Sequence, residues 1–87
     1  MMEMKYVVVR SHVGEQMFLF PKNINHDALA ETLNHIKYGS GGNWERFPHE
    51  PVSAGFTDGA TCYGRSESLN LDSRDIDTMI LRNGGKG

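Results

Sequence analysis

Ser66 is the residue whose neighbours most resemble a catalytic motif. It lies in Gly64-Arg65-Ser66-Glu67-Ser68, which begins like the Gly-x-Ser-x-Gly turn of many hydrolases but ends in serine where that tight turn needs glycine. The hydrolase arrangement also needs a histidine later in the chain, and none follows Ser66. We therefore interpret Ser66 and Ser68 as hydroxyls at a strand end that bond to nearby backbone groups.

The four histidines are the next candidates, because imidazole is a common metal ligand and proton carrier. They are His12, His26, His35 and His49, and no two have the i, i+4 spacing that places a metal-binding pair on one helix face. His35 follows Glu31 by one helical turn, as in an exposed pair, and His26 is expected at the first helical position, facing solvent. We expect neither a metal site nor a bound cofactor.

A glycine-rich run and a single cysteine could also carry chemistry. Gly39-Ser40-Gly41-Gly42 is not followed by the Lys-Ser/Thr of a phosphate-binding loop, so we interpret it as a helix end and a flexible link. Cys62 has no basic residue nearer in sequence than Arg65, which predicts a buried, inert thiol. A lone cysteine suits a reducing cytosol. Together these features predict no catalytic residues.

Length and charge restrict the function further. The chain has 87 residues and a formal net charge of −2, which indicates a single domain over 1–87 with one thin core. General nucleic-acid binding is disfavoured because the sequence has no basic block. Apolar runs such as Tyr6–Val9 are too short to cross a membrane, and the first residues do not resemble a signal peptide. We expect a cytoplasmic protein that does not bind membranes.

The first half of the chain predicts a hairpin followed by a helix. Lys5–Arg10 is rich in β-branched residues, Met17–Phe20 is a second apolar run, and Pro21 ends the second strand. The apolar spacing then becomes helical, which predicts a helix from about residue 26 to about residue 37 with Asn25 as its N-cap. Residues 39–50 follow as a long connection.

The second half predicts another hairpin and a shorter helix. Val52–Thr57 alternates as a strand with one solvent-facing side, Asp58-Gly59 is a hairpin turn, and Ala60–Leu69 is the returning strand. Asp72 or Ser73 is the expected N-cap of the helix, which ends at Asn83-Gly84-Gly85 before a disordered tail over about 84–87. One side of this helix carries three apolar residues, Ile76, Met79 and Ile80.

These elements give the order ββαββα, two hairpins each followed by a helix. The simplest packing is an α+β fold, a small two-layer sandwich in which one antiparallel sheet has both helices on a single face. Strand Lys5–Arg10 has apolar residues on both sides, more apolar surface than two short helices readily cover. We therefore also predict a homodimer.

Several motifs resemble a group of short proteins carried by bacteriophages and prophages of enterobacteria. They are an S-A-G-F strand at Ser53–Phe56, a Y-G-x-S-x-S-L-x-L segment at Tyr63–Leu71 and an S-R-x-x-D helix start at Ser73–Asp77. The first half is similar in placing an apolar strand before a helix that opens near Asn25, and the glycine-rich stretch Gly39–Phe47 departs from the group. The resemblance implies a phage or prophage setting and names no activity.

Two functions follow from these observations. The first is a non-enzymatic accessory protein that binds a host or phage protein. The alternative is a small nucleic-acid-associated module, in which Lys5, Tyr63, Arg65 and Arg74 form a local basic and aromatic face despite the acidic total charge. Tyr63, Arg65 and Arg74 are also candidate partner-binding residues under the first function, although charged positions at a strand end are more often simply solvated.

The connection over residues 39–50 supplies the other candidate contacts. Trp44, Arg46 and Phe47 are of the types that anchor interfaces, and the glycines before them give the loop reach. The opposing interpretation is that Trp44 and Phe47 fold back to cover the thin core. The partner-binding candidates are therefore Trp44, Arg46, Phe47, Tyr63, Arg65 and Arg74.

Overall fold

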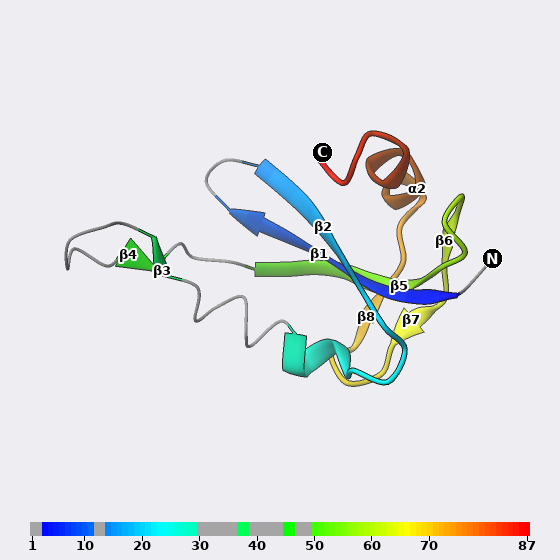
Figure 1. The fold of residues 1–87 in the computed structure, drawn as a ribbon, viewed down its shortest axis with the longest axis horizontal. Helices are drawn as coiled ribbons and strands as arrows, with labels where there is room; N and C mark the ends of the chain where they lie inside the picture. The colour runs from blue at the N-terminus through cyan, green and yellow to red at the C-terminus, as the bar shows by residue number, and fades with distance from the viewer. Residues whose placement is uncertain (1–2, 12–13, 30–36, 39–44, 47–49) are drawn as a thin grey trace.

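The first two strands form the predicted hairpin. In the computed structural model, which describes residues 3–11, 14–29, 37–38, 45–46 and 50–87, β1 (Met4–Ser11) and β2 (Gly14–Phe20) are antiparallel neighbours (Figure 1). Gly14 begins β2 with a φ of +116°, in the region that glycine adopts without strain. The strand ends at Phe20 because Pro21, which follows, cannot donate a ladder hydrogen bond.

Two further strands complete a four-stranded antiparallel sheet. β5 (Glu50–Thr57) pairs with the other side of β1, and β6 (Cys62–Tyr63) pairs with β5, so the order is β2-β1-β5-β6. The turn predicted after β5 is confirmed, since one carboxylate oxygen of Asp58 accepts the N–H groups of Ala60 and Thr61, each at 2.9 Å. This Asx-type arrangement fixes the tight return of the chain.

The prediction of one returning strand over Ala60–Leu69 is wrong. β6 stops after two residues, Gly64 turns the chain with a φ of +78°, and β7 (Arg65–Ser66) pairs instead with β8 (Leu71–Asp72) in a separate two-stranded sheet. A Cβ at Gly64 would meet the Phe56 ring at 3.0 Å. Glycine at this position therefore lets the chain leave the sheet close against that ring.

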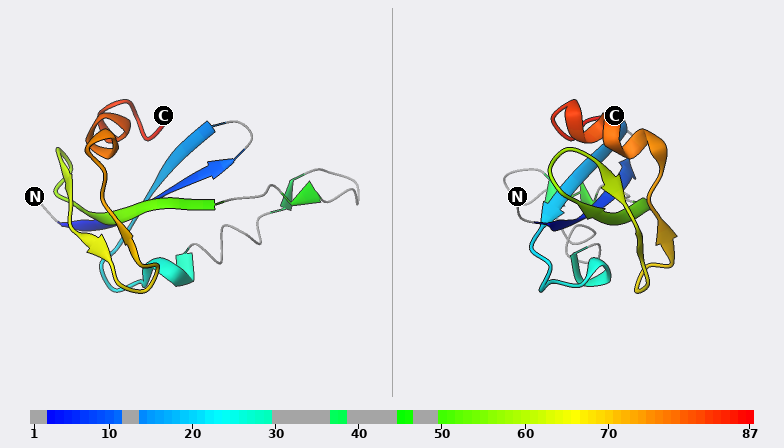
Figure 2. Two further views of the ribbon diagram at one scale, coloured as in Figure 1. Left: turned by 180° about the vertical axis from the view of Figure 1, so that it is seen from behind. Right: turned by 90° about the vertical axis from the view of Figure 1, so that its right-hand side faces the viewer.

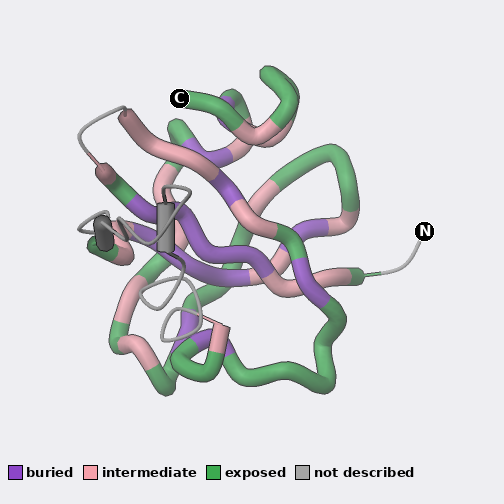
Figure 3. Tube along the Cα trace, turned by 60° about the vertical axis from the view of Figure 1, so that its left-hand side comes forward, coloured by how far each residue is buried: buried purple, intermediate pink, exposed green. Residues whose placement is uncertain are grey.

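The core occupies both faces of the sheet, so the prediction that both helices lie on one face is wrong. On one face the buried side chains are Tyr6, Val8, Met17 and Ile80. On the other they are Val7, Val9, Phe20 and Ala54, with Leu29 packed against them. Ile80 belongs to α2 (Asp75–Arg82) and Leu29 to the helical residues 26–29, and the two segments lie on opposite sides of the sheet (Figure 2). The centre of β1 is buried from both sides (Figure 3).

The first helix is confirmed where it is described and ends before its predicted boundary. Residues 26–29 are helical, but Lys37–Tyr38 forms β3 and pairs with β4 (Glu45–Arg46), so the helix does not reach residue 37. Part of the predicted 39–50 connection is thus strand. Trp44 and Phe47 lie outside the described residues, and Arg46 is described only as backbone of β4.

α2 begins later than the sequence suggests, and its apolar side is only partly buried. Its N-cap is Arg74, in place of the predicted Asp72 or Ser73. Of the three apolar residues expected on one side, Ile80 is buried, while Ile76 and Met79 are 50% and 69% exposed. Asp77, about one turn before Ile80 on the same side of the helix, is fully buried. The side of α2 that faces the sheet therefore carries Asp77 and Ile80, and the predicted apolar side is turned partly toward solvent.

The C-terminus of α2 has the predicted glycine termination. The N–H of Gly85 donates to the carbonyl of Ile80 at 2.8 Å and that of Gly84 to Leu81 at 3.2 Å, the pair of bonds of a Schellman motif. The tail, predicted to be disordered, continues along the outer edge of β2. Met17 N–H donates to Gly85 O at 2.8 Å, and Gly87 N–H donates to Glu15 O at 2.9 Å.

The class predicted from the sequence is confirmed at a coarse level, since the fold is α+β with mostly antiparallel strands. The element order differs from ββαββα, because two short hairpin pairings, β3-β4 and β7-β8, accompany the four-stranded sheet. Among the described residues, no helix combines the length and the hydropathy that crossing a membrane requires.

Candidate functional site

A buried carboxylate joins α2 to the sheet. Asp77 is 0% exposed, and its oxygens accept hydrogen bonds from the Tyr6 hydroxyl at 2.6 Å and the Ser53 hydroxyl at 3.0 Å. Arg74 donates its backbone N–H at 2.9 Å and its Nε at 3.1 Å to the same group. Burial, together with the bond to Asp77, raises the pKa of Tyr6 far above its usual range. The hydroxyl therefore stays protonated and remains a donor.

This network continues to the β1-β2 hairpin through Arg74. Its guanidinium lies 2.8 Å from Glu15 and 3.0 Å from Asp77, and 29% of its side chain is exposed. Arg10 adds a second contact to Glu15 at 2.9 Å. The hydrogen bonds from Arg74 and then Arg10 lower the pKa of Glu15. Arg74, a predicted partner-binding residue, is thus held between two carboxylates of its own chain.

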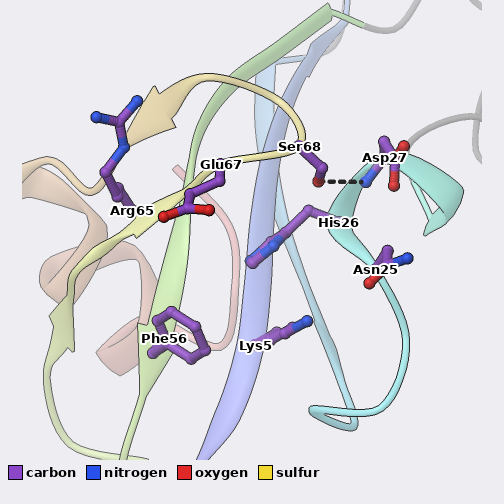
Figure 4. Close-up of a pocket in the computed structure, with 8 residues that line it drawn as sticks. All are labelled: Lys5, Asn25, His26, Asp27, Phe56, Arg65, Glu67 and Ser68. Atoms are coloured by element: carbon purple, nitrogen blue, oxygen red, sulfur yellow. Dashed lines mark hydrogen bonds between the residues drawn. The ribbon is translucent and has the colours of Figure 1, made fainter.

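His26 forms the centre of the second polar site, on the opposite face of the sheet (Figure 4). The residue is 4% exposed, and its ring packs edge-on against Phe20 and Phe56, with ring centroids 5.3 and 5.9 Å away. Nε2 lies 2.9 Å from the carbonyl oxygen of Gly55, and because a carbonyl only accepts, Nε2 carries the proton. Burial lowers the pKa of this imidazole. The prediction that His26 faces solvent is wrong, because the two aromatic rings and the Gly55 carbonyl draw it inward.

A concave, mixed-charge surface surrounds His26. It encloses about 720 Å³ and is lined by Lys5, Asn25, His26, Asp27, Phe56, Arg65, Glu67 and Ser68. The charged groups are partly used within the chain, since Lys5 donates to the carbonyl of Ile24 at 3.0 Å and Arg65 donates to the Asn70 side chain at 2.7 Å. Among the described residues, no group of three or more His, Cys, Asp and Glu could hold a metal ion. The surface is a polar recess of mixed charge.

The other residues singled out from the sequence have contacts within the chain. Ser66 is 1% exposed, and its hydroxyl accepts the Leu69 N–H at 3.2 Å, which confirms its interpretation as a strand-end hydroxyl. Cys62 is half-buried, and burial raises the pKa of its thiol. The ring of Tyr63 stacks on Phe56 with centroids 6.4 Å apart, and its hydroxyl donates to Glu3.

The most exposed large apolar side chains of the described residues include two that adjoin each other on α2. Ile76 and Met79 are separated by one helical turn, and both line a shallow groove of about 480 Å³ between α2 and the tail. The groove residues are Ile76, Met79, Ile80, Arg82, Asn83, Lys86 and Gly87. Sequence reasoning missed this surface because the helical pattern groups Ile76 and Met79 with Ile80. The burial of Asp77 accounts for this surface, because the helix turns Asp77 toward the Tyr6 and Ser53 hydroxyls. Both donors lie far away in sequence, so the sequence gives only a weak signal of this rotation.

No family model matches the chain, no curated protein matches it, and no solved structure matches it.

Of the candidate partner-binding residues, the structure brings Tyr63 and Arg65 near the His26 recess and places Arg74 on the other face of the sheet. Trp44 and Phe47 stay predictions outside the described residues. The α2 surface is the feature that the sequence did not single out.

Proposed function

We propose that the protein is a cytoplasmic, non-enzymatic accessory protein of a phage or prophage that acts by binding another protein chain through the outer face of α2. The observation that carries this proposal is the adjoining pair Ile76 and Met79, which are 50% and 69% exposed. Leaving two large apolar side chains in water on one helix face costs free energy that a partner would recover by covering them.

The chemistry of this face suits a protein partner. Methionine is unbranched and polarisable, so Met79 can adapt to the shape of an apposed side chain. Arg82 and Lys86 stand at one end of the groove, and Asp75 stands at the start of the helix. An apolar centre with charged residues around it is the usual anatomy of an interface.

The side chains with the most reactive chemistry are used in holding the fold. The Asp77 carboxylate accepts hydrogen bonds from three residues, and His26 is wedged between two aromatic rings. The Ser66 hydroxyl bonds to the turn that follows it. These contacts give each group a structural role, which supports binding over catalysis.

A nucleic-acid-associated module is the less well supported alternative. Its basic face needs Lys5, Arg65 and Arg74 on one surface, but Arg74 is engaged by Glu15 and Asp77 across the sheet from the other two. Arg65 also lies 3.6 Å from Asp72. Carboxylates of the chain therefore occupy the positions that phosphates would take.

Site-specific photo-crosslinking in enterobacterial cells tests the proposal. A photoreactive side chain at Met79 should give a discrete crosslinked species, because position 79 lies within the proposed interface. The same group at Asn23, exposed in the turn after β2, is the matched control and should give none. Absence of an adduct at position 79, or identical adducts at both positions, would overturn the proposed function.

A further inference from the structure

The exposed face of α2 carries opposite charges at its two ends. Asp75, Ile76, Met79, Arg82 and Asn83 are exposed, whereas Asp77 and Ile80 of the same helix are buried. At 3.6 residues per turn the exposed residues fall within an arc of roughly 120°. Asp75 and Arg82 are two turns apart, about 10 Å along the axis, with the apolar residues between them.

This pattern is complementary to itself when the helix direction is reversed. We propose that the α2 face binds a second copy of the chain, with the two α2 helices packed antiparallel about a twofold axis near Met79. The axis brings Asp75 beside the partner's Arg82 and Arg82 beside the partner's Asp75, so each contact occurs twice. Met79 then meets its equivalent at the centre, and Ile76 lies beside the partner's Met79. This inference rests on the proposed function and names the occupant of the same face.

Charge selects this arrangement over the others. A parallel pair of α2 helices would place Asp75 against Asp75 and Arg82 against Arg82, which is repulsive. Antiparallel helices also align their dipoles favourably. Exposed Lys86, which also lines the groove, follows the basic end of the helix and extends the same pattern.

Two of the surfaces through which a second copy could add to the sheet are covered within the part of the chain that the structure describes. The central residues of β1 are covered on both faces within one chain, which removes the apolar excess on which the dimer prediction was based. The outer edge of β2 is bonded to the tail at Glu15 and Met17. β6 is only two residues long. Among the described residues, the α2 face carries the two most exposed large apolar side chains, Ile76 and Met79, which a second copy can cover.

The dimer is expected to be weak. One eight-residue helix per chain forms a contact at the small end of specific interfaces. We expect a dissociation constant on the order of 10–100 μM, measurable by sedimentation equilibrium up to about 500 μM.

Charge reversal tests the pairing. Asp75→Arg sets the introduced arginine against Arg82 of the partner subunit, and Arg82→Asp sets the introduced aspartate against Asp75 of the partner subunit. Each repulsive contact occurs twice, so each variant alone should weaken self-association at least about tenfold. Mixed in equal amounts, the two variants carry complementary faces and should form a heterodimer close to wild-type affinity. Glu67→Arg makes the same change of charge as Asp75→Arg on the recess across the sheet and should leave self-association unchanged.

Each outcome decides the proposal. Circular dichroism shows whether the variants fold, and Asp75→Asn with Arg82→Gln repeats the test without repulsion if a reversal unfolds the helix. A monomeric wild type at about 500 μM, variants that still dimerise, or a mixture that stays monomeric overturns the dimer. If position 79 crosslinks only to other proteins, the dimer is overturned and the proposed function stands. If position 79 forms no crosslink at all, the proposed function itself is overturned.

Discussion

Replacing Asp77 with alanine removes the acceptor on which the junction of α2 and the sheet depends. Four donors from three residues converge on this carboxylate, which is fully buried. After the substitution, the Tyr6 and Ser53 hydroxyls lose their acceptor inside the fold. Arg74 keeps Glu15 but loses the Asp77 charge. We expect the free energy of unfolding to fall because the two hydroxyls remain buried without the acceptor to which they donate.

The loss should be a large fraction of the total stability. An unsatisfied buried polar group costs about 1–3 kcal/mol, and both the Tyr6 and the Ser53 hydroxyl lose their acceptor. For the two hydroxyls together we expect a loss of about 2–6 kcal/mol. A domain of this size has a stability of roughly 4–13 kcal/mol at the usual value per residue. Asp77→Ala should therefore be marginally folded, and Asp77→Asn, which keeps one acceptor oxygen, should lose less.

Urea unfolding followed by circular dichroism measures these losses. Tyr6→Phe removes one donor and leaves the others, so it should cost about 1.5–3 kcal/mol, the usual contribution of a hydrogen bond to a charged group. The double variant with Asp77→Ala should be less destabilised than the sum of the single variants, with a coupling of at least about 1 kcal/mol. A coupling near zero, or an Asp77→Ala loss below about 1 kcal/mol, would refute the role assigned to this network.

Three further predictions concern single residues. The pKa of His26 is lowered on folding, so the unfolded state binds its proton first and stability should fall as the pH drops below about 6.5. His26→Gln should reduce this dependence of stability on pH. An unchanged dependence in urea titrations at pH 5–7 would contradict the assignment. Arg74→Ala should lower the melting temperature because Arg74 joins Glu15 to Asp77, whereas Arg65→Ala, with a half-exposed side chain, should change it little; equal effects in calorimetry would argue against the difference. Gly55→Ala would place a Cβ against the carbonyl oxygen of Tyr63 and should cost about 1–3 kcal/mol in urea unfolding, and wild-type stability would show that the strands separate easily.

The elements set by local chemistry could be predicted from the sequence. The β1-β2 hairpin follows from two apolar runs around a glycine loop, and the Asp58 turn and the Gly84-Gly85 helix end depend on side-chain and backbone bonds within a few residues. Each is fixed by neighbours in the chain, so no knowledge of tertiary contacts is needed.

The candidate site could not be predicted, because it depends on contacts between distant segments. Asp77 turns inward to reach Tyr6 and Ser53, and this rotation exposes Met79. His26 is drawn inward by rings from β2 and β5. In each case a polar side chain meets donors, acceptors or rings that lie far away in sequence, although the sequence predicted that His26 faces solvent.

Backbone amide NMR spectra recorded as the protein is diluted from about 1 mM to about 20 μM test most directly whether the α2 face is the binding surface, since this range spans the expected dissociation constant. We expect concentration-dependent shifts confined to residues 75–83 and to Lys86, with the amides of β1, β5 and the His26 recess unmoved. Shifts centred on the recess or on a sheet edge, or spectra that do not change with concentration, would contradict self-association through α2.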